Sequence, residues 1–434
     1  MSTKVPNSLV NVPGSANDSS PLSMGACLRI PMMRHLWYAQ VISVFGDFLA
    51  LYAVISILTF RHHATAQQVT GVQISFLLPI AVLGFLAGVF VDRWPLKPTM
   101  VWSDLIRAVL VLLLLFATRL WHFYAALAAI STISSFFEPA QGVAVRMAVP
   151  IRGLRSANSL MQQVMLGMRI IGPPVAVLLV ESVGAASCYL IDSASFIVSA
   201  CLIGTIAFVR PQETSPGSHS AHPVRSEGSA FAQIWCDMKE GFTFIFHDAS
   251  LFFVIVALAC GMFVIGCFAP LTALYVRDIL HASNKIFGIA SALVGLGMVS
   301  GINVLNIFGK NVKNSHLVYL GLGGIAAGLL LLAAVAQLWS SFVAEFVIGF
   351  AFAGIFIPSE TTIQKETPPA LLGRVGSTVG STIFSAQISG LVLSGILAQH
   401  IGIRQVFVLC ALLLPLLILV GKLWMEPKGT TAAA

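Results

Sequence analysis

The sequence predicts an all-α membrane protein in which twelve transmembrane helices form two parallel repeats of six. Three observations carry this prediction. The 434 residues are 57% hydrophobic and only 9% charged, far from the usage of soluble domains. Apolar runs of about 20 residues, enough to cross about 30 Å of hydrocarbon as a helix, recur along the chain. The two halves also share punctuating residues at one fixed spacing.

The apolar runs define twelve expected spans. In chain order they cover residues 35–60, 68–92, 98–118, 121–148, 156–181, 184–209, 249–276, 285–309, 315–336, 339–364, 371–398 and 402–424. They form an N-terminal bundle over residues 33–209 and a C-terminal bundle over residues 249–425. Alternating ten-residue strands, which would indicate a membrane barrel, are absent.

The segments outside the spans are polar. Residues 1–32 are rich in Ser, Asn and Pro and lack the apolar core of a signal peptide, so we expect a disordered cytoplasmic tail. Residues 210–248 form the expected cytoplasmic linker, Pro/Ser-rich at first and then amphipathic over residues 231–246, as in a helix lying on the membrane surface. Residues 426–434 form a second cytoplasmic tail.

The net charge of +7 reflects orientation. With the N-terminus placed inside, most of the 24 Lys and Arg residues fall on the cytoplasmic side, as the positive-inside rule requires. Both termini of this multi-pass membrane protein are therefore expected in the cytoplasm. The lipid bilayer is the expected surrounding, and nucleic acid is not an expected partner.

The fixed spacing between the halves indicates an internal repeat. Three pairs of residues share one separation, namely Pro139 with Pro358, Pro150 with Pro369, and Arg155 with Arg374. Two parallel six-helix repeats joined by a cytoplasmic linker are typical of transporters whose halves rock about a midplane cavity.

A short hairpin between the second and third spans carries a motif. It reads G-x-x-x-D-R-x-x-x-K at Gly88, Asp92, Arg93 and Lys97. Asp92 is placed to accept hydrogen bonds at another helix's N-terminus, although a solvated turn is the alternative. Asp104 and Arg107 follow one turn apart, near the expected inner surface. We call these six residues the gating motif.

The motif resembles the signature loop of the major facilitator superfamily, and the resemblance extends over residues 33–425. Within the superfamily the chain is similar to the drug:proton antiporter branch that holds macrolide-efflux and enterobactin-exporter proteins. The residues that carry this closer similarity are 45–47, 104–107, 136–140, 157–159, 171–173, 191–196 and 240–242. The resemblance implies proton-driven export, and it implies that Asp92 and Arg93 latch the bundles near Leu371.

Four charged residues lie deep in the expected spans, where a charge costs about 2.5–3.5 kcal/mol on insertion scales. They are Asp47, Glu138, Arg169 and Asp192, all about 15 to 25 Å from the expected cytoplasmic ends. Burial favours the neutral form of a carboxyl and a nearby guanidinium the charged form. We therefore expect these residues to bind substrate or couple protons, with Glu138 and Arg169 as a cavity pair.

Simpler alternatives remain open for some acids. Asp47 and Asp192 are equally compatible with fixed hydrogen bonds between helices. Glu345 and Glu360 fall near opposite ends of the tenth span and are expected at the membrane interfaces.

An enzyme is not expected, because the sequence offers no catalytic constellation. The ten histidines lie in loops or at span ends, no CxxC pair occurs, and there is no P-loop. No metal, cofactor or catalytic residue is predicted. The resemblance implies that the function is export of a small amphiphilic molecule, such as a drug, macrolide or siderophore-like compound, across the cell inner membrane by a monomer that couples transport to protons. A lysophospholipid flippase and a nutrient importer are the alternatives.

Overall fold

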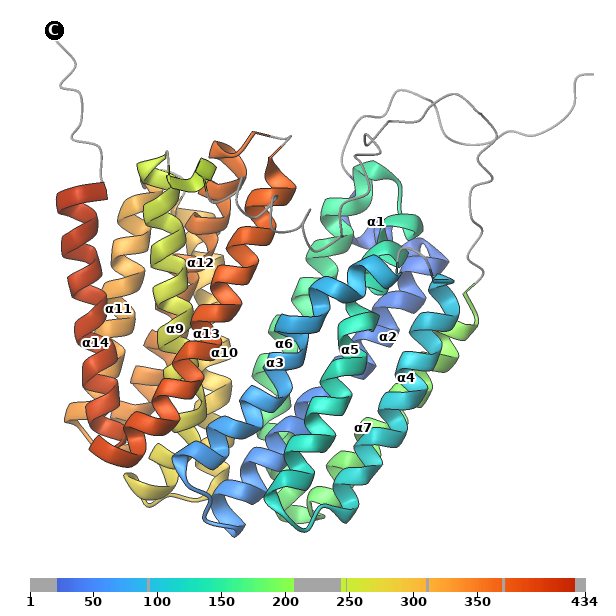
Figure 1. The fold of residues 1–434 in the computed structure, drawn as a ribbon, viewed down its shortest axis with the longest axis horizontal. Helices are drawn as coiled ribbons and strands as arrows, with labels where there is room; N and C mark the ends of the chain where they lie inside the picture. Colours follow the sequence, from blue (N-terminus) through green and yellow to red (C-terminus); the bar gives the residue numbers. More distant parts are fainter. Residues whose placement is uncertain are drawn as a thin grey trace, which may run out of the picture.

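A computed structural model gives the fold of this chain. It describes residues 22–91, 94–206, 243–246, 248–309, 312–368 and 371–425. Twelve helices within these ranges are long and apolar enough to cross a membrane. They form two bundles side by side, one of α2 to α7 and one of α9 to α14 (Figure 1). The predicted fold class is therefore confirmed.

The helices of the first bundle have the following bounds: α2 Pro31–Ser56, continued by the π-helical turn Ile57–Arg61, α3 Ala66–Val91, α4 Leu96–Leu112, α5 Leu120–Ala148, α6 Leu154–Ser182 and α7 Ala185–Gly204. Those of the second are α9 Ala249–Asp278, α10 Asn284–Phe308, α11 Asn314–Ala334, α12 Leu338–Glu366, α13 Leu372–Ile401 and α14 Ile403–Val420, followed by the turn Gly421–Met425.

The expected repeat is visible in equivalent helices. Both α5 and α12 have 29 residues and carry an internal proline, Pro139 in one and Pro358 in the other. Proline interrupts the helical hydrogen bonds locally and permits a bend. In the first bundle a further proline, Pro79, lies within α3, where the Ser135 hydroxyl of α5 donates a hydrogen bond to its carbonyl oxygen, 3.3 Å away.

The end of the expected N-terminal tail is structured. Residues 22–32 were assigned to a disordered segment, but α1 covers Met24–Arg29 and α2 begins at Pro31. Ser23 caps α1 by accepting a hydrogen bond from the Ala26 amide, and Cys27 is completely buried. The sequence signal was weak because α1 has only six residues, with a single buried side chain. The boundary of the tail at residue 32 is thus wrong.

Polar contacts between the bundles gather at one end of the molecule, which we call the sealed end. Arg277 of α9 donates hydrogen bonds to the carbonyl oxygens of Thr59 and Ala64, 2.7 and 3.0 Å away. The Asn284 side chain donates to the Ser56 hydroxyl. The loops that carry these residues converge at the bottom of Figure 1, whereas the ribbons of the two bundles diverge toward the top.

Two pairs of helices pack against each other across the interface between the bundles. Helix α6 packs against α10, and α3 packs against α13. Close approach is possible because glycines lie at the crossings: a Cβ added to Gly295 of α10 would lie 3.1 Å from the backbone of Arg169 in α6. The amphipathic segment expected over residues 231–246 lies mostly outside the described residues.

Candidate functional site: a charged cavity between the bundles

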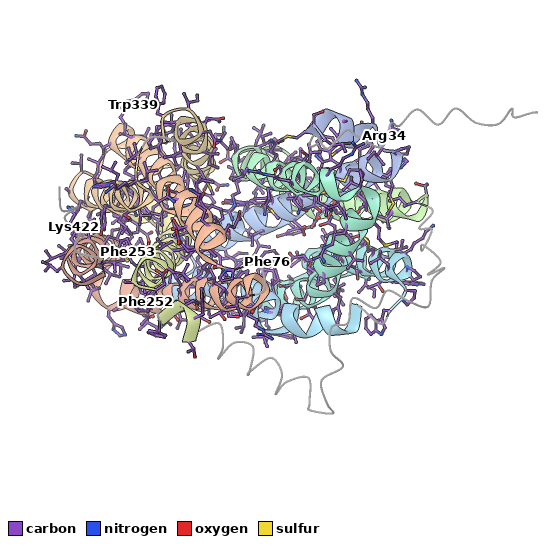
Figure 2. All side chains as sticks on the ribbon, turned by 90° about the horizontal axis from the view of Figure 1, so that it is seen from above. Arg34, Phe76, Phe252, Phe253, Trp339 and Lys422 are labelled. Carbon is purple, nitrogen blue, oxygen red and sulfur yellow. The ribbon has the colours of Figure 1, made fainter. Side chains whose placement is uncertain are left out.

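A cavity of about 450 Å³ lies between the two bundles. Its walls come from α2 to α6 on one side and from α9, α10, α12 and α13 on the other. Phe76 of α3 belongs to its lining and lies near the centre of the molecule, whereas Arg34, Trp339 and Lys422 lie at the periphery (Figure 2). The cavity is large enough for a small organic molecule.

Helix α2 contributes a polar stripe to the cavity. Gln40, Ser43 and Asp47 all line it, because residues three and four positions apart share one face of a helix. The Gln141 amide of α5 donates a hydrogen bond to the Gln40 side-chain oxygen. On α5, Glu138 is one turn from Gln141 and is exposed to the cavity in the middle of its helix.

Arg107 provides the positive charge nearest these acids. It is only 3% exposed, forms an ion pair with the fully buried Asp104, and lies between the rings of Phe137 and Phe196, at 4.4 and 4.3 Å from their centroids. One of its terminal nitrogens is also 3.5 Å from the Ser134 hydroxyl. Its charge acts on Asp47, Glu138 and Asp192.

The position of Arg107 corrects an expectation. Asp104 and Arg107 were placed near the inner surface, but α4 begins at Leu96, so Arg107 lies about 16 Å along the helix at 1.5 Å per residue. Arg107 lines the cavity and belongs to the group of charges at mid-depth. The predicted span 98–118 begins only two residues after α4 does and already puts Arg107 about 13 Å inside the membrane, so the error came from grouping Arg107 with the hairpin motif at the surface.

The other two predicted residues, Arg169 and Asp192, lie in different places. Arg169 lines the cavity and is exposed to it, and its charge interacts with Tyr52. Asp192 is 1% exposed and lies behind α2, against Gly46, where an added Cβ would overlap its carboxyl group. Among the described residues Glu138 and Arg169 share the cavity without forming an ion pair with each other.

A family model described as Major Facilitator Superfamily matches residues 36–386 and, in a second match, residues 254–433. The chain belongs to the Major Facilitator Superfamily.

Similar proteins of this superfamily include transporters and efflux proteins. Macrolide efflux protein A of Streptococcus pyogenes is 26% identical over 394 residues, covering 87% of this chain and 92% of that protein. The MFS-type transporter YfiS of Bacillus subtilis is 27% identical, covering 88% and 91%. Multidrug resistance protein MdtG of Proteus mirabilis is 23% identical, covering 84% and 87%.

Solved structures with the same fold are distant in sequence. The nucleoside transporter NupG superposes with a TM-score of 0.66 at 14% identity, covering 90% of this chain and 98% of the other. A bacterial homologue of the human lysosomal transporter Spinster, in an inward-facing unoccupied conformation, has a TM-score of 0.67 at 11% identity, covering 93% and 96%. The fold and the relatives indicate a multi-pass membrane transporter of small molecules rather than an enzyme.

The gating motif of this superfamily member is only partly described. Gly88 lies in α3, while Asp92 and Arg93 lie outside the described residues, so their proposed contact near Leu371 stays a prediction. Lys97 donates a hydrogen bond to the Ile206 carbonyl oxygen, 2.9 Å away. A positive charge beside the carbonyl groups at the C-terminal end of a helix is stabilising. Lys97 therefore links the start of α4 to the end of α7 within the first bundle.

One acid of this superfamily member was misplaced by the sequence reasoning. Glu345 was expected at an interface, but it is 1% exposed, lines the cavity, and has a buried Oε2 atom without a hydrogen-bond partner among the described residues. Helix α12 begins at Leu338, so Glu345 lies two turns inside it. The same criterion that identified the other acids, the cost of placing a charge inside the membrane, would have identified Glu345 from the sequence.

Proposed function

We propose that this chain is a secondary active exporter of a small amphiphilic molecule, driven by a proton gradient and working by alternating access. The observation that carries the proposal is the cavity between the two bundles, which combines apolar walls with Asp47, Glu138, Arg107 and Arg169. Export is favoured over import by the similarity to proteins named for macrolide efflux and multidrug resistance.

The distribution of charge gives the proposed orientation. Under the positive-inside rule the sealed end, with few Lys and Arg residues in its loops, faces outward. Both termini are then cytoplasmic, and the conformation is inward-facing, with the cavity accessible from the cytoplasm or the inner leaflet. In a bacterial cell the corresponding membrane is the inner membrane.

Asp47 and Glu138 are the proposed proton carriers. Both carboxyl groups lie at mid-depth within the field of Arg107. A proton on either acid removes a negative charge that Arg107 otherwise stabilises, leaving this arginine with Asp104 as its principal partner. Loss of that proton restores the attraction to α2 or α5. Proton binding and helix position are thereby linked within one bundle.

The proposal is tested in proteoliposomes of defined orientation with and without an imposed pH gradient. A radiolabelled macrolide and a fluorescent lipophilic cation serve as substrates. We expect gradient-dependent movement by the wild type and its loss in Glu138→Gln or Asp47→Asn. Glu360→Gln is the matched control, because Glu360 lies on α12 away from the cavity lining.

Two results would contradict the proposal. Absence of movement of both probes under every gradient, with folded protein in the membrane, would refute export of broad amphiphiles. Movement that is independent of the gradient, and equal in the wild type and in both acid variants, would refute proton coupling at Asp47 and Glu138.

A further inference from the structure

The charges that line the cavity do not balance. The lining includes three acids, Asp47, Glu138 and Glu345, and two arginines, Arg107 and Arg169. Arg107 is already paired with Asp104, which does not belong to the lining. The remaining field of the cavity is therefore negative whenever its acids are ionised, which favours a positively charged occupant.

Among the described residues, Glu345 is the acid of this lining on which no arginine or lysine acts. It is the ionisable residue that the second bundle contributes to the described lining, and its Oε2 atom is buried without a hydrogen-bond partner. A buried carboxylate without a partner is costly and is relieved either by protonation or by a counter-charge, so in its ionised form Glu345 gains most from a cation that arrives with the substrate.

The neighbouring side chains do not provide Glu345 with a counter-charge. Tyr52 of α2 and Tyr275 of α9 lie within its electrostatic range. The Tyr275 hydroxyl already donates to the Leu332 carbonyl oxygen, 2.9 Å away. Arg169 and Arg404 act on these two tyrosines, but neither forms an ion pair with Glu345 within the described part of the chain.

Aromatic rings supply a surface for the rest of such a substrate. Tyr52 stacks on Phe287 of the opposite bundle with ring centroids 5.7 Å apart, and on Phe48 at 6.2 Å. All three rings line the cavity. Aromatic faces attract organic cations and provide apolar area. Tyr52, the central ring, is also within the electrostatic range of Glu345.

We propose that Glu345 binds the cationic centre of the substrate, with Tyr52 and Phe287 against its apolar body, so that the transported class is lipophilic organic cations. This inference rests on the proposed function and narrows it. Anionic compounds, including siderophore-like chelators with several acidic groups, are disfavoured by the same uncompensated negative charge.

The test is equilibrium binding of two probes to the purified full-length protein in detergent. Tetraphenylphosphonium and tetraphenylborate have nearly the same size and shape but opposite charge. We expect the wild type to bind the cation more tightly than the anion. Glu345→Gln should weaken binding of the cation at least about tenfold, the loss of one nearby charge in a poorly solvated site, and should not weaken binding of the anion.

Two further variants keep the test decisive. Glu345→Asp retains the charge and should retain the preference for the cation, even if binding of both probes weakens because the side chain is shorter. Glu360→Gln makes the same chemical change on the same helix outside the cavity and should bind as the wild type does. Each variant is checked by gel filtration for a folded monodisperse species.

The inference is overturned if the wild type fails to bind the cation, if it prefers the anion, or if Glu345→Gln binds the cation as tightly as the wild type. Its failure is distinct from that of the proposed function, since binding in detergent needs no gradient. Glu345-dependent binding without gradient-driven transport refutes proton-driven export alone. Acid-dependent transport with Glu345-independent binding refutes the cation site alone.

Discussion

Arg277 is the residue whose removal should most directly release the sealed end. Its guanidinium donates two hydrogen bonds across the bundle interface, to the carbonyl oxygens of Thr59 and Ala64. Its side chain is 17% exposed. Arg277→Ala removes both hydrogen bonds and leaves two carbonyl groups to be rehydrated.

The magnitude follows from the number and kind of these bonds. A hydrogen bond from a charged group contributes about 1.5–3 kcal/mol, and we take the lower end because the site is partly exposed. The ion pair with the neighbouring Asp278 is exposed and adds little. The two hydrogen bonds together then contribute about 3 kcal/mol. If between half and all of this free energy is specific to the sealed conformation, the ratio of sealed to open molecules falls about 10- to 100-fold.

Distances between spin labels measure this ratio. Trp121 and Trp339 are 60% and 78% exposed and begin the equivalent helices α5 and α12 at the sealed end. Labels at both positions, in a background without the seven native cysteines, should show a longer distance population in Arg277→Ala. Arg277→Lys, with one terminal nitrogen, should give an intermediate shift.

The matched control is Arg61→Ala. Arg61 is an exposed arginine at the same end that takes no part in the described hydrogen bonds between the bundles. The reasoning is refuted if the distance distribution of Arg277→Ala equals that of the wild type, or if Arg61→Ala shifts it equally.

Two further predictions concern stability in detergent, measured by thermal unfolding. Asp104→Asn removes the ion-pair partner of the buried Arg107, which should cost about 3–5 kcal/mol if the more distant acids do not compensate. Asp278→Asn, in an exposed pair, should change stability by less than about 0.5 kcal/mol, and equal losses would show that the buried pair is not special. Gly46→Ala forces α2 away from α7 and should cost about 1–3 kcal/mol. Gly376→Ala, where an added Cβ meets nothing within 4 Å, should be neutral or stabilising, and similar losses in both would contradict the packing argument.

The twelve helices were predictable because each span is encoded locally. About 20 apolar residues bounded by polar loops identify a transmembrane helix whatever its neighbours are. The internal repeat was likewise readable, since prolines and arginines mark the same turns in both halves. The cavity acids Asp47 and Glu138 were found for the same local reason, the cost of placing a charge in hydrocarbon.

The partners of those acids were not predictable, because they depend on how helices rotate and approach one another. Arg107 was grouped with the hairpin motif near the inner surface, and only the packing of α4 against α5 and α7 shows that it reaches the cavity acids. Asp192 was assigned to about the right depth, but its carboxyl group lies against Gly46 of α2 and not in the cavity. The missing side chain of Gly46 allows α7 to approach α2 this closely. Glu345 was judged by its distance from a span end, whereas the structure buries it at the wall of the cavity.

The two repeats share a fold but differ in where their charges lie, and this difference bears on mechanism. By the separation that relates Pro139 to Pro358, Glu138 corresponds to Ile357 and Arg169 to Ile388. Within the described cavity lining, the first bundle therefore holds the network of acids and arginines, and Glu345 is the ionisable residue of the second. A proton on Asp47 or Glu138 makes the cavity less negative and weakens the attraction for a cation at Glu345. A cation bound at Glu345 in turn disfavours protonation of Asp47 and Glu138. Under the proposed proton and cation sites, the two ligands compete through the field of one small cavity without sharing a carboxylate, and such competition is the coupling that exchange of a proton for a cation requires.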